Sequence, residues 1–286
     1  MSRIVFVNGD FIPAEQATIP IMDRGFLFAD GVYEVSAVLN GRLIDNDAHL
    51  ARLARSLAAI RIPNPYPADV WARLQTDLVD RNGLVEGLVY MEVTRGAAER
   101  DFAFPKGGRP TVVMFSQTKT ITRAPLAETG AAVITVPDLR WKRRDIKSVA
   151  LLAQVLAKQA AVEAGVAEAW MVEDGAVTEG SSSTAFIITP DRRVVTRPLS
   201  HAILPGITRA AVMQLAREHD LVVEERPFTL EEAYAAAEAF FTSASAFVMP
   251  VVAIDGRPVG GGGPGPLTRQ LRALYFDMAG APAAPA

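Results

Sequence analysis

The chain has 286 residues, of which 50% are hydrophobic and 21% are charged, and its formal net charge at pH 7 is −3. This balance argues against nucleic acid or an anionic membrane as the main partner, and the absence of cysteine excludes disulfides and thiolate metal sites. The three histidines lie far apart, the N-terminus does not resemble a signal peptide, and no stretch is long enough to span a bilayer. We therefore expect a soluble, cytoplasmic, globular enzyme without a metal centre.

The first part of the chain alternates between strands and amphipathic helices. Asn-Gly pairs at two turns indicate hairpins, because both residue types accept positive φ. Apolar residues at helical spacing indicate two helices, and Asp47 is placed to cap the first. In chain order we predict hairpins centred on 8–9 and 40–41, helices over 47–62 and 67–83, and buried strands over 88–96 and 111–118.

The second part follows a polar, proline-containing segment, residues 118–127, which we predict to be a linker. Strands and helices mix without a regular βαβ rhythm, so the predicted fold class is α+β, with a small N-terminal domain over 1–117 and a larger one over 128–278. We predict strands within 131–139, 168–198 and 239–259, helices over 148–166, 207–220, 230–239 and 266–279, and a disordered tail over 279–286.

Lys147 lies where the segment WKRRDIKSVALL turns from charged to apolar. Only five of the 29 basic residues are lysines, and arginine cannot replace lysine in amine chemistry. Ser148 is predicted to cap the long helix, so that the helix end and apolar surroundings would favour a neutral amine at Lys147. Such an amine can form a Schiff base with an aldehyde cofactor. On these residues alone, a lysine that extends into solvent is the simpler explanation.

The segment VTEGSSSTAF places Glu179 at the end of a strand, before Gly180 and three serines. A carboxylate that faces inward needs a positively charged or protonated partner. One such partner is the ring nitrogen of pyridoxal phosphate, which must be protonated to accept electrons. A turn with a solvated glutamate is the alternative.

Two further segments, ILPGITR and FTSASAF, are suited to holding a phosphate. Ile207 and Thr208 open a helix with free backbone N–H groups, and Ser243 and Ala244 offer a second set of donors. Arg52 could add a bidentate contact. Small polar turns before helices are common, however, and Arg52 could equally be a surface arginine.

Seven motifs carry a resemblance to a known family. The sequence resembles the class IV (fold type IV) pyridoxal-phosphate aminotransferases, and within them the D-amino-acid aminotransferases. This resemblance implies a two-domain homodimer whose larger C-terminal domain has a barrel-like sheet, with the cofactor in the cleft between the domains. The motifs, in chain order, are DRGFLFADGVYEV, HLARL, VTRG, IKS, VTEGSSS, LPGITR and FTSAS.

The resemblance also implies roles for individual residues. Lys147 matches the catalytic Schiff-base lysine, and Glu179 matches the partner of the pyridine nitrogen. The residues matched to phosphate or other cofactor contacts are Arg52, Ile207, Thr208 and Ala244, and Ser243 is a further candidate from its place in the same segment. The residues placed in the substrate site are Tyr33, Arg100, Phe102 and Ser183, and Arg100 matches an arginine that binds the substrate carboxylate across the dimer interface.

Phe102 departs from the pattern of the D-amino-acid subgroup, which has a histidine two residues after this arginine. Phenylalanine cannot donate a hydrogen bond, so carboxylate binding would rest on Arg100 and Tyr33, and the pocket becomes more apolar. Bulky substrates or amines without a carboxylate are then open alternatives to small D-amino acids. Equally, Phe102 could merely pack the loop.

The resemblance predicts ping-pong transfer of an amino group from a D-amino acid, such as D-alanine, to a 2-oxo acid. Within the family, a branched-chain L-aminotransferase and an (R)-amine transaminase are alternatives. Aminodeoxychorismate lyase activity and a non-catalytic binding protein are alternatives of other classes. The expected partners are these small molecules and a second copy of the chain, with neither nucleic acid nor membrane.

Overall fold

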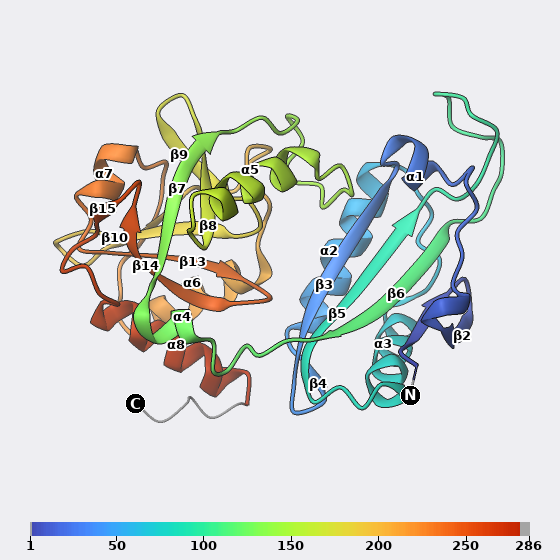
Figure 1. Cartoon of the computed structure of the whole chain (residues 1–286), viewed down its shortest axis with the longest axis horizontal. Helices are drawn as coiled ribbons and strands as arrows, with labels where there is room; N and C mark the ends of the chain where they lie inside the picture. Colours follow the sequence, from blue (N-terminus) through green and yellow to red (C-terminus); the bar gives the residue numbers. More distant parts are fainter. Residues whose placement is uncertain (1, 281–286) are drawn as a thin grey trace. The chain divides into compact units, whose positions relative to one another are not determined.

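The computed structural model describes residues 2–280, which divide into two compact units (Figure 1). The first unit comprises the residues up to Thr120 together with Ile146–Ala150, and the second comprises Ile121–Asp145 and the residues from Leu151 on. Within the predicted linker, residues 118–127, Ile121 is fully buried, and helix α4 (Pro125–Thr129) begins. The predicted tail lies, from residue 281 on, outside the described residues.

The first unit is a six-stranded antiparallel sheet in the order β2-β1-β6-β5-β3-β4. Asn8 and Asn40 adopt positive φ at the turns between β1 and β2 and between β3 and β4, as predicted. The strands are β1 (Ile4–Val7), β2 (Asp10–Pro13), β3 (Gly31–Leu39), β4 (Arg42–Leu43), β5 (Glu86–Thr94) and β6 (Thr111–Thr118). The helical segments are η1 (Ala14–Gln16), α1 (Arg24–Phe28), α2 (Asn46–Ala59) and α3 (Ala68–Arg81).

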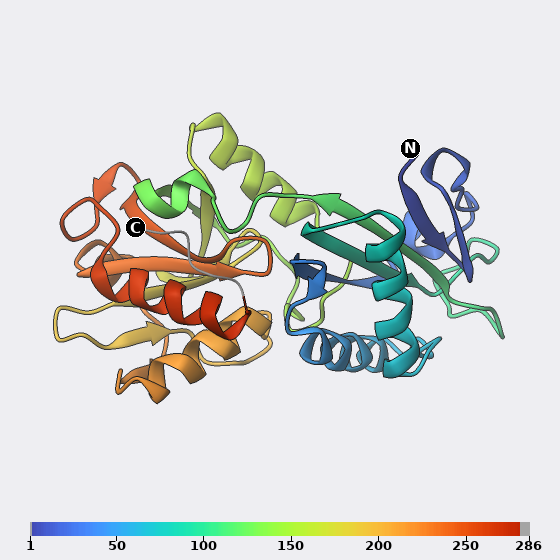
Figure 2. The same cartoon turned by 90° about the horizontal axis from the view of Figure 1, so that it is seen from below.

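Strand alternation gives this sheet two different faces. Val89, Met91 and Val93 of β5 are fully buried in a core that includes Trp71 and Leu78 of α3. Helices α2 and α3 cover this face, as Figure 2 shows. The intervening residues of β3, β5 and β6 form the opposite face, which carries half-buried aromatic side chains.

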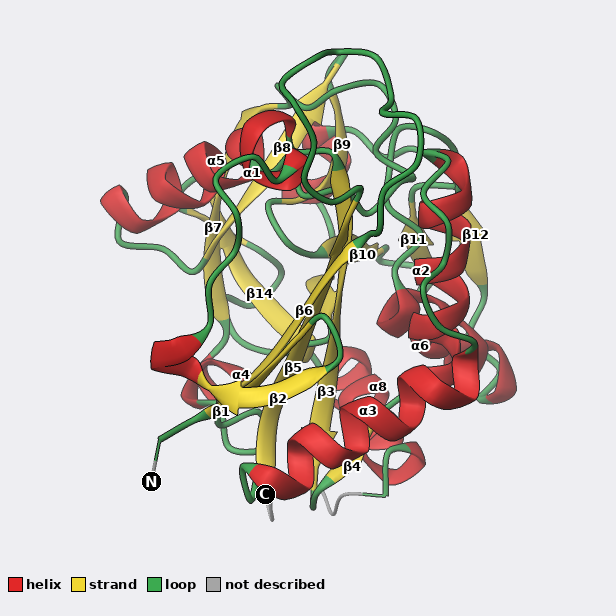
Figure 3. Ribbon diagram, turned by 90° about the vertical axis from the view of Figure 1, so that its right-hand side faces the viewer, coloured by secondary structure: helices red, strands yellow, loops and turns green. Residues whose placement is uncertain are grey.

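The second unit is built on a nine-stranded mixed sheet, which curls into an open half-barrel (Figure 3). Its order is β12-β11-β10-β13-β14-β7-β8-β9, with β15 paired to β14. The strands are β7 (Ala131–Pro137), β8 (Glu168–Glu173), β9 (Ala176–Gly180), β10 (Thr184–Ile188), β11 (Val194–Thr196), β12 (Val223–Glu225), β13 (Glu238–Ser243), β14 (Phe247–Ile254) and β15 (Arg257–Pro258). The helices besides α4 are α5 (Leu152–Glu163), α6 (Ile207–Glu218), α7 (Leu230–Tyr234) and α8 (Pro266–Met278).

Two helix predictions are wrong at their ends. Helix α5 begins at Leu152 rather than at Ser148, because Ser148 forms a bridge with Val32 and the Val149 N–H donates to Gly31 at the start of β3. The predicted Ser148 cap is therefore wrong. Helix α7 ends at Tyr234, and β13 begins at Glu238, where the alanine-rich sequence predicts continued helix. Tertiary strand pairing overrides helix propensity at these positions.

None of the described helices is long and apolar enough to cross a membrane. Within residues 2–280, no group of three or more His, Asp or Glu side chains is arranged to hold a metal ion.

Candidate functional site

Lys147 lies in a non-helical segment that is fixed to the start of β3 in the first unit. The backbone N–H of Tyr33 donates to the Lys147 carbonyl over 3.0 Å, and the Val149 N–H donates to the Gly31 carbonyl over 3.1 Å. The Lys147 Nζ lies 4.1 Å from the centroid of the Tyr33 ring. These two predicted site residues are therefore neighbours. Lys147 does not directly precede a helix as predicted, because α5 starts only at Leu152.

Arg52 is buried in α2, where it forms a bidentate ion pair with Glu34 of β3. The Nε–Oε1 and Nη2–Oε2 distances are 2.7 and 2.8 Å, and His49 Nδ1 lies 2.8 Å from the same carboxylate. The surface-arginine alternative is therefore wrong, and Glu34 fixes the orientation of the guanidinium. A phosphate contact by Arg52 stays a prediction.

Tyr33 also belongs to a row of aromatic rings on the open face of the first sheet. Its ring stacks on Tyr90 at a centroid distance of 5.6 Å, and Tyr90 stacks on Phe115 at 4.7 Å. Glu92, directly opposite Tyr33 in the register, accepts a 2.6 Å hydrogen bond from the Tyr90 hydroxyl. Burial, with a contribution from the charge of Asp23, raises the pKa of Glu92.

Arg100 and Phe102 lie in the irregular segment between β5 and β6, and both are exposed. The Arg100 guanidinium lies 5.3 Å from the ring of Phe28 and 5.6 Å from the ring of Phe102. These two predicted substrate residues are therefore close to each other. Phe102 contacts Phe28 at a centroid distance of 5.4 Å yet remains 78% exposed, so it does not simply fill the core.

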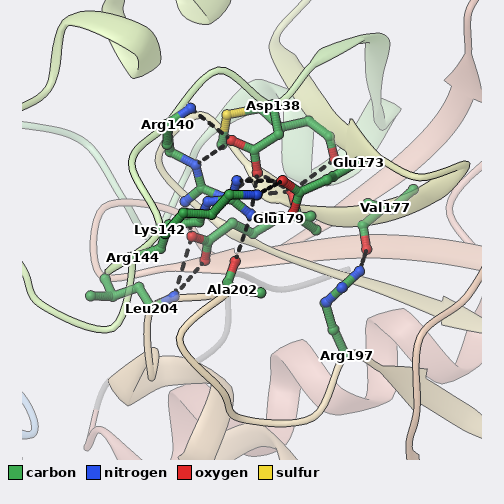
Figure 4. Close-up of polar contacts among 12 residues, drawn as sticks. Asp138, Arg140, Lys142, Arg144, Glu173, Val177, Glu179, Arg197, Ala202 and Leu204 are labelled. Atoms are coloured by element: carbon green, nitrogen blue, oxygen red, sulfur yellow. Dashed lines mark hydrogen bonds and ion pairs between the residues drawn. The ribbon is translucent and has the colours of Figure 1, made fainter.

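Glu179 in β9 is buried in the second unit, where a network of charged side chains surrounds it (Figure 4). The Arg140 guanidinium forms an ion pair with Oε1, and the backbone N–H of Leu204 lies 3.2 Å from each carboxylate oxygen. Burial raises the pKa of Glu179, and the Arg140 charge opposes this shift. The turn with a solvated glutamate is therefore wrong.

Arg140 is held in place by Asp138, which follows β7. The guanidinium contacts both Asp138 oxygens, with Nε–Oδ1 and Nη2–Oδ2 distances of 2.9 and 2.6 Å. Arg144 lies 3.3 Å from Asp138 and pairs with Glu173 at 2.8 Å. The sequence motifs did not identify this set, because the paired groups lie on different strands and loops.

The three serines after Glu179 surround Glu168, a buried carboxylate at the start of β8. Ser183 donates to Glu168 Oε2 over 3.0 Å, Ser182 lies 3.5 Å from the same oxygen, and Ser181 donates to Oε1. The Ser183 hydroxyl thus has a partner within the protein, and substrate binding by Ser183 stays a prediction.

Helix α6 begins at Ile207, as predicted, with Gly206 as its N-cap. The backbone N–H groups of Ile207 and Thr208 belong to its first turn, which has no acceptor four residues earlier within the helix. A Cβ at Gly206 would lie 2.9 Å from Thr184 Oγ1, and Thr184 is directly opposite Thr242 in the sheet. The hydroxyl of Thr242 is buried without a partner among the described residues.

The two predicted phosphate-binding segments are thus close together at one end of the second sheet. Ser243 ends β13, and Ala244 follows it in the turn to β14. Thr242, which sequence reasoning missed, precedes both residues. Its place within the FTSAS motif was the available signal.

Comparison with known proteins identifies relatives along nearly the whole chain. The family model described as Amino-transferase class IV matches residues 31–254. The D-alanine aminotransferase of Bacillus licheniformis is 41% identical over 270 residues, which cover 94% of this chain and 94% of that protein. The D-alanine aminotransferase of Staphylococcus aureus (strain MSSA476) is 39% identical over 270 residues, which cover 94% of this chain and 95% of that protein.

A solved structure shows the same fold. It is a branched-chain amino acid aminotransferase from T.th. with pyridoxamine 5'-phosphate, 24% identical to this chain. The two superpose with a TM-score of 0.89, covering 98% of this chain and 95% of that chain. The predicted α+β fold is thereby confirmed.

Proposed function

Because the chain belongs to the class IV aminotransferases, we propose that it moves an amino group from a D-amino acid, such as D-alanine, to a 2-oxo acid in a ping-pong reaction with pyridoxal phosphate. Support for the D-amino acid comes from the similarity to D-alanine aminotransferases. The observation that carries the proposal is the placement of Lys147, whose amine lies over the Tyr33 ring in a segment fixed by backbone hydrogen bonds.

The residues at the start of α6 fit a phosphate group. Ile207 and Thr208 offer backbone N–H groups of the first helical turn, and the buried Thr242 hydroxyl lacks a partner within the described chain. Helix N-termini favour anions, since the N–H groups and the helix dipole both point positive charge outward. Ser243, Ala244 and Arg52 would complete the set.

Glu179 fits a protonated ring nitrogen. It is buried, its pKa is raised by burial, and Arg140 pairs mainly with one of its oxygens. A carboxyl group in this environment gains from a further cationic partner. Arg140, held by Asp138, would keep the carboxylate oriented towards that partner.

When bound, pyridoxal phosphate supplies an aldehyde for a Schiff base and a ring that accepts electrons. Lys147 Nζ would then take the proton from the α-carbon of the donor, which requires a neutral amine. Tyr33 would limit where this amine can move, and Arg100 would bind the donor carboxylate. A homodimer is part of the same proposal.

Phe102 supports a second candidate, an (R)-amine transaminase. The ring is 78% exposed and stands two residues after Arg100, so it would offer an apolar surface rather than a hydrogen bond to the donor. Donors without a carboxylate would depend less on Arg100.

The test is a half-reaction with the cofactor-loaded protein. D-alanine should convert the aldehyde form of the cofactor to the amine form, with a loss of its visible absorbance, whereas L-leucine should not. Conversion by (R)-1-phenylethylamine, but not by D-alanine, would favour the second candidate. Lys147→Ala should abolish turnover and still bind the cofactor without a covalent bond. Turnover near that of the parent protein in this variant would refute the role of Lys147.

A further inference from the structure

The segment that carries Arg100 has little regular structure of its own. It runs from Arg95 to Pro110, between β5 and β6, and most of its side chains are exposed. An arginine on such a segment can present its guanidinium in one place only if something else fixes the backbone. The first unit provides that fixation immediately after Arg100.

Arg24, at the start of α1, is 3% exposed and reaches the backbone of this segment. Its Nη1 donates to the Asp101 carbonyl over 2.6 Å, and its Nη2 lies 3.5 Å from the Phe102 carbonyl. The carbonyl groups of the two residues that follow Arg100 are therefore both contacted by one buried guanidinium. Hydrogen bonds from a charged donor are stronger than those between neutral groups.

Asp30 holds Arg24 in turn. Its Oδ2 lies 2.8 Å from Arg24 Nε and 2.7 Å from Arg95 Nε, and its Oδ1 lies 2.9 Å from Arg95 Nη2. Arg95 stands at the base of the segment and also donates to the carbonyls of Ile60 and Arg61. One carboxylate thus fixes both the base and the middle of the segment.

The ring of Phe28 links the two guanidinium groups. Arg24 lies 4.8 Å from its centroid and Arg100 lies 5.3 Å from it. Phe28 also contacts the ring of Phe102. Movement of Arg24 would therefore disturb the backbone next to Arg100 and the ring on which Arg100 rests.

We propose that Arg24 is a positioning residue that sets where Arg100 presents its guanidinium, and so sets the affinity for donors that carry a carboxylate. This inference rests on the proposed role of Arg100. Arg24 acts only through Arg100 and its segment.

A double-mutant cycle tests this inference. Arg24→Lys keeps the charge near Asp30 but loses the planar fork that reaches the Asp101 carbonyl. We expect the KM for D-alanine, at saturating 2-oxo acid, to rise roughly tenfold, with kcat within about twofold of its original value. In an Arg100→Leu background, Arg24→Lys should have no further effect on KM, because interacting positions are not additive.

The outcomes separate this inference from the proposed function. If Arg24→Lys changes the KM equally in both backgrounds, or in neither, the positioning role of Arg24 is overturned. A rise in KM caused by Arg100→Leu would still support the role of Arg100. If Arg100→Leu leaves the KM unchanged, the roles of Arg100 and Arg24 are both overturned, but the test of Lys147 by Lys147→Ala is not affected.

A second variant covers the case in which Arg24→Lys does not fold. Asp30→Asn keeps the Arg24 side chain but removes the ion pair that holds it. It should raise the KM for D-alanine in the parent protein and have no further effect in the Arg100→Leu background. Arg81→Lys is the matched control, because Arg81 also stacks on an aromatic ring, that of Phe11 at 4.4 Å, but lies on α3. It should leave KM and kcat unchanged.

Discussion

Glu34 shows how a single buried carboxylate can determine the charge arrangement around a candidate phosphate ligand. Burial alone would raise the pKa of Glu34, but the charge and hydrogen bonds of Arg52, with a further hydrogen bond from His49, lower it to about 2. The ionised form is therefore favoured in the folded protein. Arg52 in turn is oriented by an ion pair of fixed geometry rather than by solvent.

Replacement of this carboxylate should make stability less dependent on pH. Because the folded pKa of Glu34 is about 2, below the ordinary value of 4.5, its stabilisation is present above the ordinary pKa and is lost as pH falls towards about 2. We expect Glu34→Gln to lose roughly 3–5 kcal/mol of unfolding free energy at pH 7, because Arg52 stays buried without its charged partner. Denaturant unfolding at several pH values measures this loss.

The difference between Glu34→Gln and the parent protein should shrink as pH falls from about 4.5 to about 2. Asp191→Asn is the control. Asp191 pairs with Arg193 at an exposed site, so this change should alter the free energy of unfolding little at any pH. A loss of stability that is the same at pH 3 and pH 7 would contradict the ion-pair account.

At the scale of residues, the sequence predicts individual candidate site residues better than it predicts the side chains that pair with them. Lys147 and Tyr33 were both predicted, and they lie together. Glu34 stands in the motif DGVYEV, but strand alternation shows only that it faces inward. Its partner Arg52 comes from a helix, and no local pattern shows that a helix side chain will meet a strand side chain. The same reason applies to Arg140 and Glu179.

At the scale of elements, the predicted start of α6 is confirmed and that of α5 is wrong, and the difference has a physical reason. At α6, Pro205 and Gly206 directly precede the helix, and these residue types predict its start at Ile207 from the local sequence alone. At α5, Ser148 is a good N-cap residue by type, but it forms a bridge with Val32 instead. That pairing joins residues far apart in the chain, and local propensity cannot reveal it.

The start of α6 should be sensitive to a single methyl group. A Cβ at Gly206 would meet Thr184 Oγ1 at 2.9 Å and Arg209 Cβ at 3.2 Å, and both side chains are buried. The Thr184 side chain or the helix start must shift to accommodate it, so we expect Gly206→Ala to weaken the binding of pyridoxal phosphate to the apoprotein roughly tenfold. Titration followed by cofactor absorbance measures this.

Gly261→Ala is the matched control for Gly206→Ala. A Cβ at Gly261 would meet nothing within 4 Å, and the change should leave cofactor affinity intact. Cofactor affinity in Gly206→Ala equal to that of the control would argue against α6 as the phosphate site.

At the scale of the whole molecule, the chain crosses between its two units more often than the sequence indicates. Ile146–Ala150 belong to the first unit, although the residues on both sides belong to the second. A linear reading of composition predicts one boundary near residue 118 and cannot show a short return of this kind. This return bears on the proposed function, because the returning segment carries Lys147.

Ile146 should anchor this returning segment. Its side chain is 5% exposed in the core of the first unit, and it precedes Lys147, whose carbonyl accepts from the Tyr33 N–H. Ile146→Ala should cost roughly 2–5 kcal/mol of unfolding free energy, and Ile146→Val only about 0.5–1.5 kcal/mol, since a larger cavity costs more.

Hydrogen exchange in Ile146→Ala should also speed up at the Tyr33 and Val149 amides, but not at amides within β13. Slow exchange at both amides in a destabilised Ile146→Ala protein would show that strand pairing, and not the side chain, holds Lys147 in place.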